Sequence, residues 1–485
     1  MEEEKIEKIM EIALKRAFFW PTAEFYSDRQ AGFYDYGPYG VMLKNNIINL
    51  WRKIFLSEEE NIIEIDGSQI LPESVFIASG HLQHFTDPLV GCPRCNFKAR
   101  ADKLIEEKVK KQISEKLPLS EYDKLIQKYK IKCPKCGSSL KKTENWNMML
   151  RTEIGVDFKK CYLRPETCQS IFASFPRIYR TMRVKLPFGI AQVGKSFRNE
   201  VSPRQGLVRL REFTQAEIEI FFNPERDICM EKVKEEILPL YIENKILKIK
   251  CGEAVKKKII SCNLIAYYLA LLKNFSIKAG LPEEKIRFRY VDKEKPFYAK
   301  ETWDFECLTS LGWLELCACN HRGDYDLIRH QKVSGKSFEI VDETTNKKII
   351  PNIFELSLGI DRLVLALLDT NYKEDAQNER VLFTFKPYIA PIFVAVFPLV
   401  KKGGMSEIAK QIYHELKKDF SCFYDDSGSI GRRYRRQDEI GTPFCITIDS
   451  QTLQDNTVTI RERDSMQQIR VSKEKIKEEL KDYKL

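Results

Sequence analysis

The sequence predicts an α+β fold of helices and strand-like runs, with an inserted segment and a separate α/β domain at the C-terminus. Three observations lead to this fold. Strand-like runs concentrate at residues 181–222. Two Cys-x-x-Cys pairs bracket a Lys/Glu-rich stretch at residues 88–145, which has the character of an insertion. Residues 387–485 alternate strand, helix, strand, strand and helix, the pattern of a small α/β domain.

The remaining elements follow from hydrophobic periodicity. Apolar residues at helical spacing predict helices over residues 2–19 and 41–56. A strand at residues 62–65 and an irregular segment around Pro72 come next. Residues 225–290 are predicted to be mostly helical, and residues 363–368 form a buried helix after a short apolar run.

Composition and charge exclude several classes of protein. The chain has 485 residues, of which 43% are hydrophobic and 31% charged, and this length suggests about three domains. The longest apolar run, residues 389–400, contains two prolines and is shorter than the roughly 20 residues of a membrane-spanning helix. The acidic N-terminus has no secretory pattern, so we expect a cytoplasmic protein. A net charge of +10 fits either a polyanion-binding protein or an ordinary soluble enzyme.

The two cysteine pairs, Cys92/Cys95 and Cys133/Cys136, predict a structural Zn²⁺ site. Four thiolates provide the closed tetrahedral ligand set of such sites. The intervening residues 96–132 exceed the usual spacing of a zinc ribbon, and we expect helices to fill the gap. Free thiols or a redox pair are the alternatives.

One motif is misleading. Residues 189–196 match the phosphate-binding-loop pattern letter for letter. That loop requires a preceding strand and a following helix, whose N-terminus and loop amides hold the phosphates. Here the spacer itself has strand character and no helix pattern follows, so we expect no phosphate-binding loop.

The densest polar feature joins residues 197–200 to residues 209–219 through a polar loop. Side chains that alternate along paired strands project to one face, so these residues could meet over one sheet: Arg198, Glu200, Arg211, Gln215 and Glu217. An exposed charged hairpin is the alternative, but Phe197, Phe213 and Ile218 would anchor the strands in a core.

A second polar feature lies at Glu355–Arg362, directly before the apolar run 363–368. An arginine at the start of an apolar helix is costly unless it is paired. A helix N-terminus favours anions. Together these features predict a phosphate site at Arg362.

These segments make the chain resemble the class II aminoacyl-tRNA synthetases, and among them the glycyl-tRNA synthetases of the archaeal and eukaryotic type. Residues 197–221 are similar to motif 2 of that class, residues 355–368 to motif 3, and residues 41–72 to motif 1, the dimer-forming element. Further similarity lies at residues 163–167, 298–304, 313–316 and 324–327.

The resemblance implies a domain organisation and an activity. Residues 1–87 and 146–386 would form the catalytic domain, an antiparallel sheet flanked by helices with a helical insertion at about 225–295. Residues 88–145 would form a zinc-binding insertion and residues 387–485 an α/β anticodon-binding domain. Such an enzyme activates glycine with ATP to glycyl-adenylate and then transfers the glycyl group to the 3′ end of tRNA(Gly). The implied cofactors are ATP, Mg²⁺ and structural Zn²⁺, and the implied assembly is a homodimer without membrane contact.

Matching positions imply roles for individual residues. Arg198 and Arg362 would be catalytic, with Arg198 on the α-phosphate and the glycine carboxylate and Arg362 on the ATP tail. Glu200 and Phe213 would position adenine, and Glu315 would hold Mg²⁺. The residues implied to bind ATP are Arg198, Asn199, Glu200, Val208, Arg209, Leu210, Arg211, Glu212, Phe213, Glu315, Leu316, Gly359, Ile360, Asp361 and Arg362. The residues implied to bind glycine are Arg100, Glu166, Phe213, Thr214, Gln215, Ala216, Glu217, Glu355, Ser357 and Gly359.

Glycine has no side chain, so its selection must depend on its ammonium group and on exclusion of anything larger. The resemblance places Glu166, Glu217 and Glu355 around the ammonium, with Ser357 beside it. Three carboxylates repel one another in an empty site, and ligand binding relieves this repulsion. Each hydrogen bond to a charged group contributes roughly 1.5–3 kcal/mol, enough to hold a small ligand.

The chain departs from the family pattern near this pocket. The unusual residues are Leu356, Cys168, Ser170, Ala318, Asn320 and His321. The charged residues are all present, so we expect the activity to be retained although the shape of the pocket differs.

An arginine cluster in the C-terminal domain surrounds Tyr434. Arginines beside an aromatic ring suit phosphate contact and base stacking, so the predicted tRNA-binding residues are Arg432, Arg433, Arg435 and Arg436. A solvated basic turn is the alternative.

Two other functions stay open from the sequence. A synthetase-like protein could keep the fold and only bind nucleic acid or a partner, although such relatives usually lose the arginines of motifs 2 and 3. An active enzyme could instead use serine, threonine or proline, which the crowded carboxylates disfavour.

Overall fold

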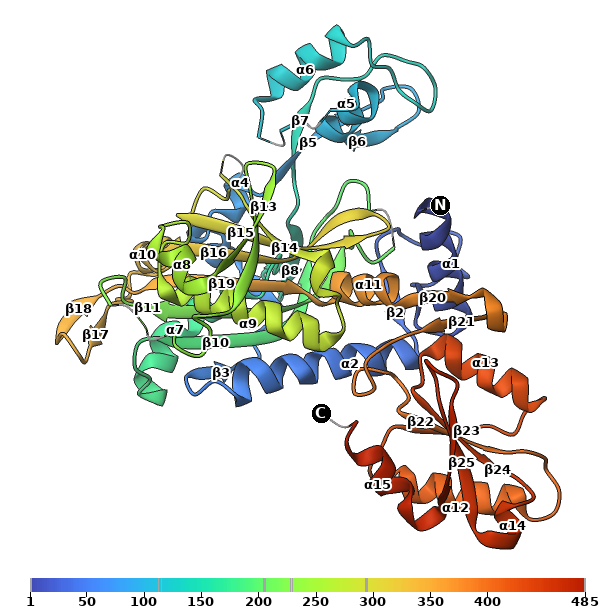
Figure 1. Cartoon of the computed structure of the whole chain (residues 1–485). Coiled ribbons are helices and arrows are strands. Elements are labelled where there is room, and N and C mark those ends of the chain that lie inside the picture. Colours follow the sequence, from blue (N-terminus) through green and yellow to red (C-terminus); the bar gives the residue numbers. More distant parts are fainter. Residues whose placement is uncertain are drawn as a thin grey trace.

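The computed structural model describes residues 2–111, 113–114, 116–203, 206–226, 228, 230–292 and 295–483. Its centre is a nine-stranded, mainly antiparallel sheet (Figure 1). In spatial order its strands are β13 (Lys245–Lys250), β12 (Ile237–Ile242), β14 (Ile286–Tyr290), β15 (Glu301–Thr309), β16 (Gly312–Gly323), β19 (Asn352–Gly359), β11 (Glu212–Phe222), β10 (Phe188–Phe197) and β3 (Ile62–Glu64).

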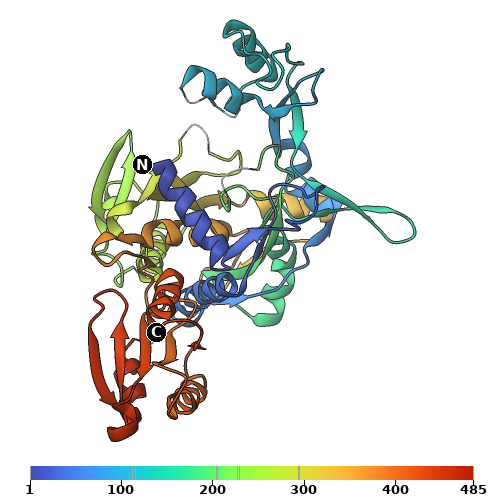
Figure 2. The same cartoon turned by 90° about the vertical axis from the view of Figure 1, so that its right-hand side faces the viewer.

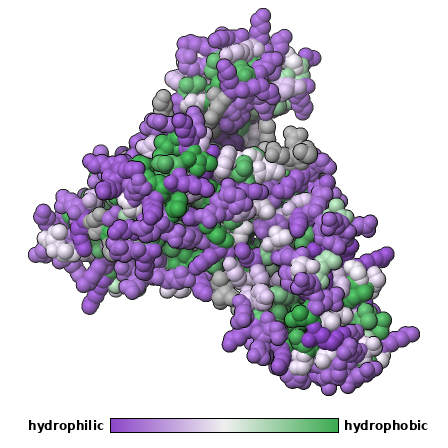
Figure 3. Space-filling model, viewed as in Figure 1, coloured by the Kyte–Doolittle hydropathy of each residue, from purple (hydrophilic) through white to green (hydrophobic). Residues whose placement is uncertain are grey.

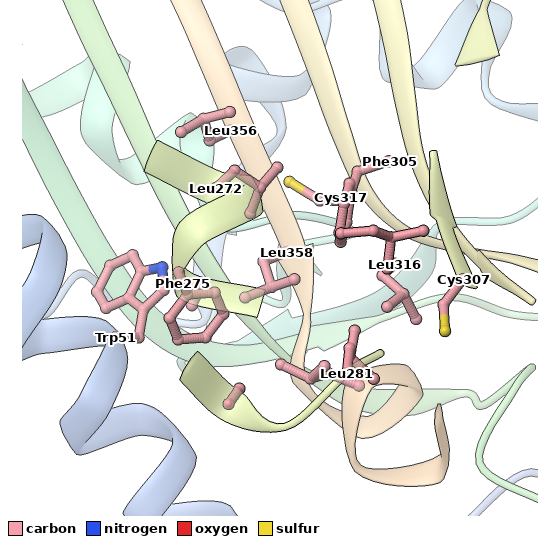
Figure 4. Packing of buried hydrophobic residues seen from close by; sticks show 14 of the residues in the cluster. Trp51, Leu272, Phe275, Leu281, Phe305, Cys307, Leu316, Cys317, Leu356 and Leu358 are labelled. Carbon is pink, nitrogen blue, oxygen red and sulfur yellow. The ribbon is translucent and has the colours of Figure 1, made fainter. Parts of the chain in front are cut away.

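Helices cover both faces of this sheet. The main core packs α2 (Pro38–Arg52), α9 (Asn263–Ala279) and α11 (Ile360–Asn371) against one face. Figure 4 shows part of this core, where Trp51 and Phe275 lie near Leu358 of β19. A second cluster packs α7 (Cys168–Met182) and α10 (Tyr325–Ser334) near the opposite face.

The two-residue period of β11 divides its side chains between the two faces. Ala216, Ile218 and Ile220 pack into the main core, whereas Phe221 joins the second cluster. Glu217 and Glu219 therefore lie on the same face as Phe221. Strand β19 follows the same rule, so the polar residues of both central strands share one face.

Residues 88–145 stand away from the body of the protein (Figures 1 and 2). A three-stranded sheet of β5 (Thr86–Gly91), β6 (Lys98–Arg100) and β7 (Glu144–Asn147) carries α5 (Ala101–Val109) and α6 (Leu119–Lys128) around a small core of its own. Helices thus fill the gap between the cysteine pairs as expected, and Pro118 immediately precedes the second.

The C-terminal domain has a separate core around a five-stranded mixed sheet. In spatial order the strands are β23 (Cys422–Tyr424), β22 (Val394–Pro398), β24 (Phe444–Ile448), β25 (Thr457–Glu462) and β26 (Gln468–Ser472). Its helices are α12 (Met405–Leu416), α13 (Ile430–Ile440), α14 (Thr452–Asp455) and α15 (Ile476–Lys481).

The remaining elements complete the described part of the chain. The helices are α1 (Glu2–Lys15), η1 (Lys53–Ser57), α3 (Glu73–Ala78), α4 (His81–His84), α8 (Cys251–Lys256), η2 (Glu283–Lys285), η3 (Ala376–Asn378) and η4 (Lys473–Lys475). The strands are β1 (Phe19–Pro21), β2 (Tyr34–Tyr36), β4 (Ile70–Pro72), β8 (Leu150–Ile154), β9 (Lys159–Leu163), β17 (Ile340–Asp342), β18 (Lys347–Ile349), β20 (Tyr372–Asp375) and β21 (Arg380–Phe383).

The prediction of a mostly helical segment at residues 225–295 is wrong. Strands β12, β13 and β14 extend the main sheet there, and α8, α9 and the short η2 are the described helices. The hairpin of β12 and β13 turns at Glu243 and Asn244, both with positive φ. From the sequence alone, the apolar residues on either side of this turn are as consistent with a helix as with two strands.

The segments around Pro72 and at residues 189–196 are both strands. The segment around Pro72 is not irregular, because β4 pairs with β9. Residues 189–196 lie within β10 and so form no phosphate-binding loop.

The face of the molecule in Figure 3 is mostly hydrophilic. Among the described residues, no helix combines the length and hydrophobicity needed to cross a bilayer.

Candidate functional site

A cavity of about 550 Å³ lies over the polar face of the central strands. It is lined by residues of β11, β15, β16 and β19, by the loop between β10 and β11, and by the start of α11. The lining includes these residues predicted from the sequence: Glu166, Arg198, Glu200, Val208, Arg209, Leu210, Phe213, Thr214, Gln215, Glu315, Leu316, Glu355, Ser357, Gly359, Asp361 and Arg362.

The register of β11 and β19 places acidic and hydroxyl side chains opposite one another. Glu217 pairs with Ser357, and Glu219 pairs with Glu355. Directly opposite residues in an antiparallel pair have neighbouring side chains on one face. Glu166, which follows β9, brings a further carboxylate to the group, and one oxygen each of Glu166 and Glu355 lies within 4.8 Å of the other.

Glu355 is held by two buried partners. Asn320 Nδ2 donates to it at 2.6 Å, and Arg322 Nη1 donates at 3.0 Å. Arg322 also pairs with Asp326 and stacks on the Tyr298 ring at 3.9 Å. Since Arg322 is only 1% exposed, its charge acts within a low-dielectric region.

The carboxylates of this group have different proton affinities. Burial and the adjacent Glu166 raise the pKa of Glu217. Burial raises the pKa of Glu355 to about 7, against the effect of Arg322 and with the help of Glu166 and Glu217. Burial would also raise the pKa of Glu166, but the nearby His81 and Arg322 hold it well below its usual range. Separated pKa values of this kind are typical of functional sites.

Glu217 does not reach the cavity. Its side chain is fully buried and accepts hydrogen bonds from Thr167, Gln215 and Ser357. Gln215 and Ser357 do line the cavity, so Glu217 orients two lining residues from behind.

Arg198 lies between two aromatic rings at the cavity wall. Its guanidinium is 5.3 Å from the Phe85 ring centroid and 5.2 Å from that of Phe213, and its Nε donates to the Pro165 carbonyl at 3.2 Å. This environment restrains the side chain while leaving guanidinium hydrogens for a ligand.

A second group of charges lines another part of the cavity. Arg362 Nη1 is 3.6 Å from Glu315 Oε2, and Arg289 pairs with Asp304. Burial and Glu315 raise the pKa of Asp304 to about 8. Carboxylate oxygens are the ligands that Mg²⁺ prefers, and guanidinium groups suit phosphates. The donor set of Asp304 and Glu315 therefore fits a hydrated Mg²⁺ beside a polyphosphate.

The other predicted site residues lie outside the cavity lining. Arg100 pairs with Asp87 at 3.3 Å and with Asp102 at 2.7 Å, and its contact with substrate stays a prediction. Arg211 holds the backbone of Glu200 and Ala31. The remaining ones are Asn199, Glu212, Ala216 and Ile360, the last two fully buried.

Several residues of the site were not predicted from the sequence. Arg289, Asp304 and Tyr298 line the cavity, and Arg322 donates a hydrogen bond to the lining residue Glu355. The segment around Asp304 does belong to a stretch of family similarity, which was the available signal. Arg322 was detectable as a charge in a strand that also contains the apolar run 316–319.

The unusual residues have identifiable surroundings. Cys168 Sγ is 3.1 Å from Glu166 Oε1, and Asn320 supports Glu355. Ala318 and Asn320 line the cavity, whereas Leu356 points into the main core. Ser170 and His321 lie outside the lining: Ser170 contacts Arg164, and His321 Nε2 lies 3.2 Å from Asn352 Oδ1.

The four predicted cysteines of the insertion converge. Cys92 and Cys136 have their sulfurs 3.5 Å apart, as do Cys95 and Cys133, and all four sulfurs lie within 4.8 Å of one another. A tetrahedral Zn²⁺ with Zn–S bonds of about 2.3 Å separates its sulfurs by about 3.8 Å. The arrangement is therefore compatible with zinc.

The predicted tRNA-binding arginines do not share one environment. Arg433 is 3% exposed and donates to the Pro398 and Gly428 carbonyls. This buried position indicates a structural role and does not support the predicted contact with tRNA. Arg435 donates to the Asn378 carbonyl, and Arg436 pairs with Asp425. Arg432 is exposed.

Comparison with known proteins identifies two domains. The tRNA synthetase class II core domain (G, H, P, S and T) matches residues 156–371, and the anticodon binding domain matches residues 393–483.

Curated relatives extend this similarity over nearly the whole chain. The glycine–tRNA ligase of Methanococcus vannielii is 39% identical over 96% of this chain and 98% of the relative. That of Methanocaldococcus jannaschii is 40% identical over 99% of both chains, and that of Pyrococcus furiosus is 38% identical over 99% of both. The chain therefore belongs to the glycine–tRNA ligase family of class II tRNA synthetases.

Proposed function

We propose that this chain ligates glycine to tRNA(Gly) in two steps. ATP and glycine first form glycyl-adenylate and pyrophosphate, and the glycyl group then passes to the 3′-terminal adenosine of the tRNA. The observation that carries this proposal is a single cavity with two arginines, Arg198 and Arg362, and an acidic corner at Glu166 and Glu355.

Each part of the cavity has a proposed role. Glu166, Glu355 and Ser357 bind the ammonium of glycine, and Glu217 positions Ser357 from behind. Arg198 binds the carboxylate of glycine and the α-phosphate, so that the attacking oxygen and the phosphorus are held together. Positive charge at Arg198 stabilises the negative charge that develops during attack.

The ATP end of the cavity has its own set of residues. Glu200 and Phe213 position adenine, while Arg362 binds the terminal phosphates. Asp304 and Glu315 would hold Mg²⁺, which neutralises the phosphate oxygens when it is bound. Arg289 keeps Asp304 in place.

We further propose a cytoplasmic homodimer. Helix α2 and strand β3 belong to the motif 1 segment, and β3 lies at the edge of the main sheet, where a second copy can approach. In the C-terminal domain, Arg432, Arg435 and Arg436 contact the tRNA backbone.

The amino-acid specificity is tested by ATP–pyrophosphate exchange. We expect exchange to depend on glycine and to be at least about a hundredfold weaker with alanine, serine, threonine or proline, because a β-carbon meets fixed polar groups. Equal exchange with serine, or no exchange with any amino acid from a folded and metal-loaded protein, would contradict the proposal.

Arg198→Ala should slow adenylate formation severely while leaving tRNA affinity within about twofold of the original. Loss of one preorganised charge at the reacting atoms typically slows the reaction by about 10²–10³-fold. Exchange kinetics and filter binding of tRNA measure the two effects. Arg177→Ala on the exposed side of α7 is the control and should change neither. Parallel loss of exchange and tRNA binding would show that Arg198 is structural.

Glycine use should decrease as the pH falls through about 7. Only ionised Glu355 attracts the ammonium, and burial raises the pKa of this residue to about 7. A single group with this pKa predicts that kcat/KM for glycine falls about tenfold from pH 8 to pH 6, whereas KM for ATP changes little. Glu355→Gln should weaken glycine binding and remove this step from the pH profile. An unchanged step in the variant would assign it to another group.

Zinc content tests the cysteine cluster. We expect one Zn²⁺ per chain by elemental analysis, and its loss in Cys92→Ser, because three thiolates leave the tetrahedral set incomplete. The insertion of that variant should become sensitive to limited proteolysis, since metal binding and folding are coupled in small metal-binding units. Cys161→Ser, outside the cluster, should keep full zinc content. Full zinc in Cys92→Ser would rule out this ligand set.

A further inference from the structure

A short segment between α3 and the insertion reaches the acidic corner of the cavity. Ser79 follows α3, and His81 begins α4. Ser79 Oγ lies 2.7 Å from His81 Nδ1, and His81 Nε2 lies 3.1 Å from Glu166 Oε1. Ser79 and His81 are both buried. A buried line of hydrogen bonds thus ends on a carboxylate that faces the cavity.

The two oxygens of Glu166 are used differently. Oε1 lies within hydrogen-bond distance of three groups: His81 Nε2, Cys168 Sγ at 3.1 Å and Gln169 Nε2 at 3.0 Å. Within the described part of the chain, no side chain donates to Oε2. The carboxylate is therefore fixed through one oxygen, and the other keeps its acceptor capacity for a ligand.

His81 can donate to Glu166 in either protonation state. Neutral imidazole accepts from the Ser79 hydroxyl at Nδ1 and carries its hydrogen on Nε2. In the imidazolium form, Nδ1 donates to Ser79 Oγ, and the Ser79 hydroxyl can then donate to the Phe76 carbonyl at 3.4 Å. Ser79 thus fixes the ring orientation in both states.

The same segment supports the other end of the amino-acid site. The Phe85 ring is 5.3 Å from the imidazole of His81 and 5.3 Å from the guanidinium of Arg198. Residues 81–85 therefore contact both Glu166 and Arg198, the residues proposed to bind the ammonium and the carboxylate of glycine. Strand β5 of the insertion begins directly afterwards, at Thr86.

We propose that His81, oriented by Ser79, is a positioning residue that holds Glu166 in the geometry needed to bind the amino acid. This inference rests on the proposed function, because it takes glycine as the ligand of Glu166. His81 itself does not line the cavity, so its effect on the ligand passes through Glu166.

Two substitutions of His81 separate this role from simple packing. In His81→Gln, the longer amide can donate from near the original Nε2 position. In His81→Asn, the shorter amide stays near the Nδ1 position and loses the contact with Glu166. We expect His81→Asn to raise KM for glycine about tenfold or more, because the lost hydrogen bond involves a charged group. His81→Gln should keep this KM within about threefold.

ATP–pyrophosphate exchange, with glycine and ATP varied in turn, measures both constants. KM for ATP should stay within about twofold in both variants, since His81 contacts only the amino-acid end. His84→Asn is the matched control: His84 lies on the same short helix, is exposed and contacts Phe297, so its substitution should change neither constant. Ser79→Ala, which removes only the partner of Nδ1, should raise KM for glycine by about threefold and provides the test if His81→Asn does not fold.

The outcomes distinguish this inference from the proposed function. Absence of glycine-dependent exchange in the unmodified protein overturns both. With that exchange present, equal effects of His81→Asn and His81→Gln, or parallel increases in KM for glycine and ATP, reduce His81 to a packing residue. An unchanged KM for glycine in Ser79→Ala and in a folded His81→Asn variant overturns the inference as well.

Discussion

The structure depends on the burial of several carboxylates beside the fully buried guanidinium of Arg322. Glu217, Glu219 and Glu355 lie on one face of two adjacent strands, and Arg322 pairs with Glu355 and Asp326. Isolated buried charges are very costly, so the group must be neutralised by protons, by partners or by a ligand. Glu219 illustrates the first route, because burial and Glu355 raise its pKa well above the usual range and both its oxygens lack partners among the described residues. In the function proposed here, the ammonium of glycine supplies the third route.

Strand register creates this arrangement, and the rest of the fold maintains it. Two antiparallel neighbours with a two-residue period place acidic side chains on one face while Ile218 and Leu358 pack on the other. Helices α2, α9 and α11 bury that apolar face, which fixes the strands. Arg164 joins β10 to the loop between β3 and β4. Its guanidinium donates to the carbonyls of Lys195 and Gly67, and its backbone carbonyl accepts from the Phe197 amide. Small shifts in register would move the whole polar set to the other face.

The sequence was most informative where a local pattern decides the structure. The strand pair of motif 2, the helix that begins near Arg362 and the converging cysteines are found where expected. The sequence was misleading where contacts distant along the chain decide the outcome. Local periodicity could not show that the segment after residue 225 adds strands to a sheet. Nor could it show that Arg100 and Arg433 have internal partners, or that His81 contacts Glu166, because those partners are set by tertiary packing.

The hydrogen bonds around the proposed ammonium site also offer an account of how so small a ligand would be selected. Ser357 is tied to Glu217 and Gln215, and Asn320 is tied to Glu355 and Thr302. A side chain on the ligand could enter only by displacing these groups and leaving buried donors or acceptors unpaired, a cost of about 1–3 kcal/mol for each. The walls of the site are therefore rigid because they are already bonded to one another. Selection for glycine then requires no contact with a side chain, only walls whose hydrogen bonds are too costly to break.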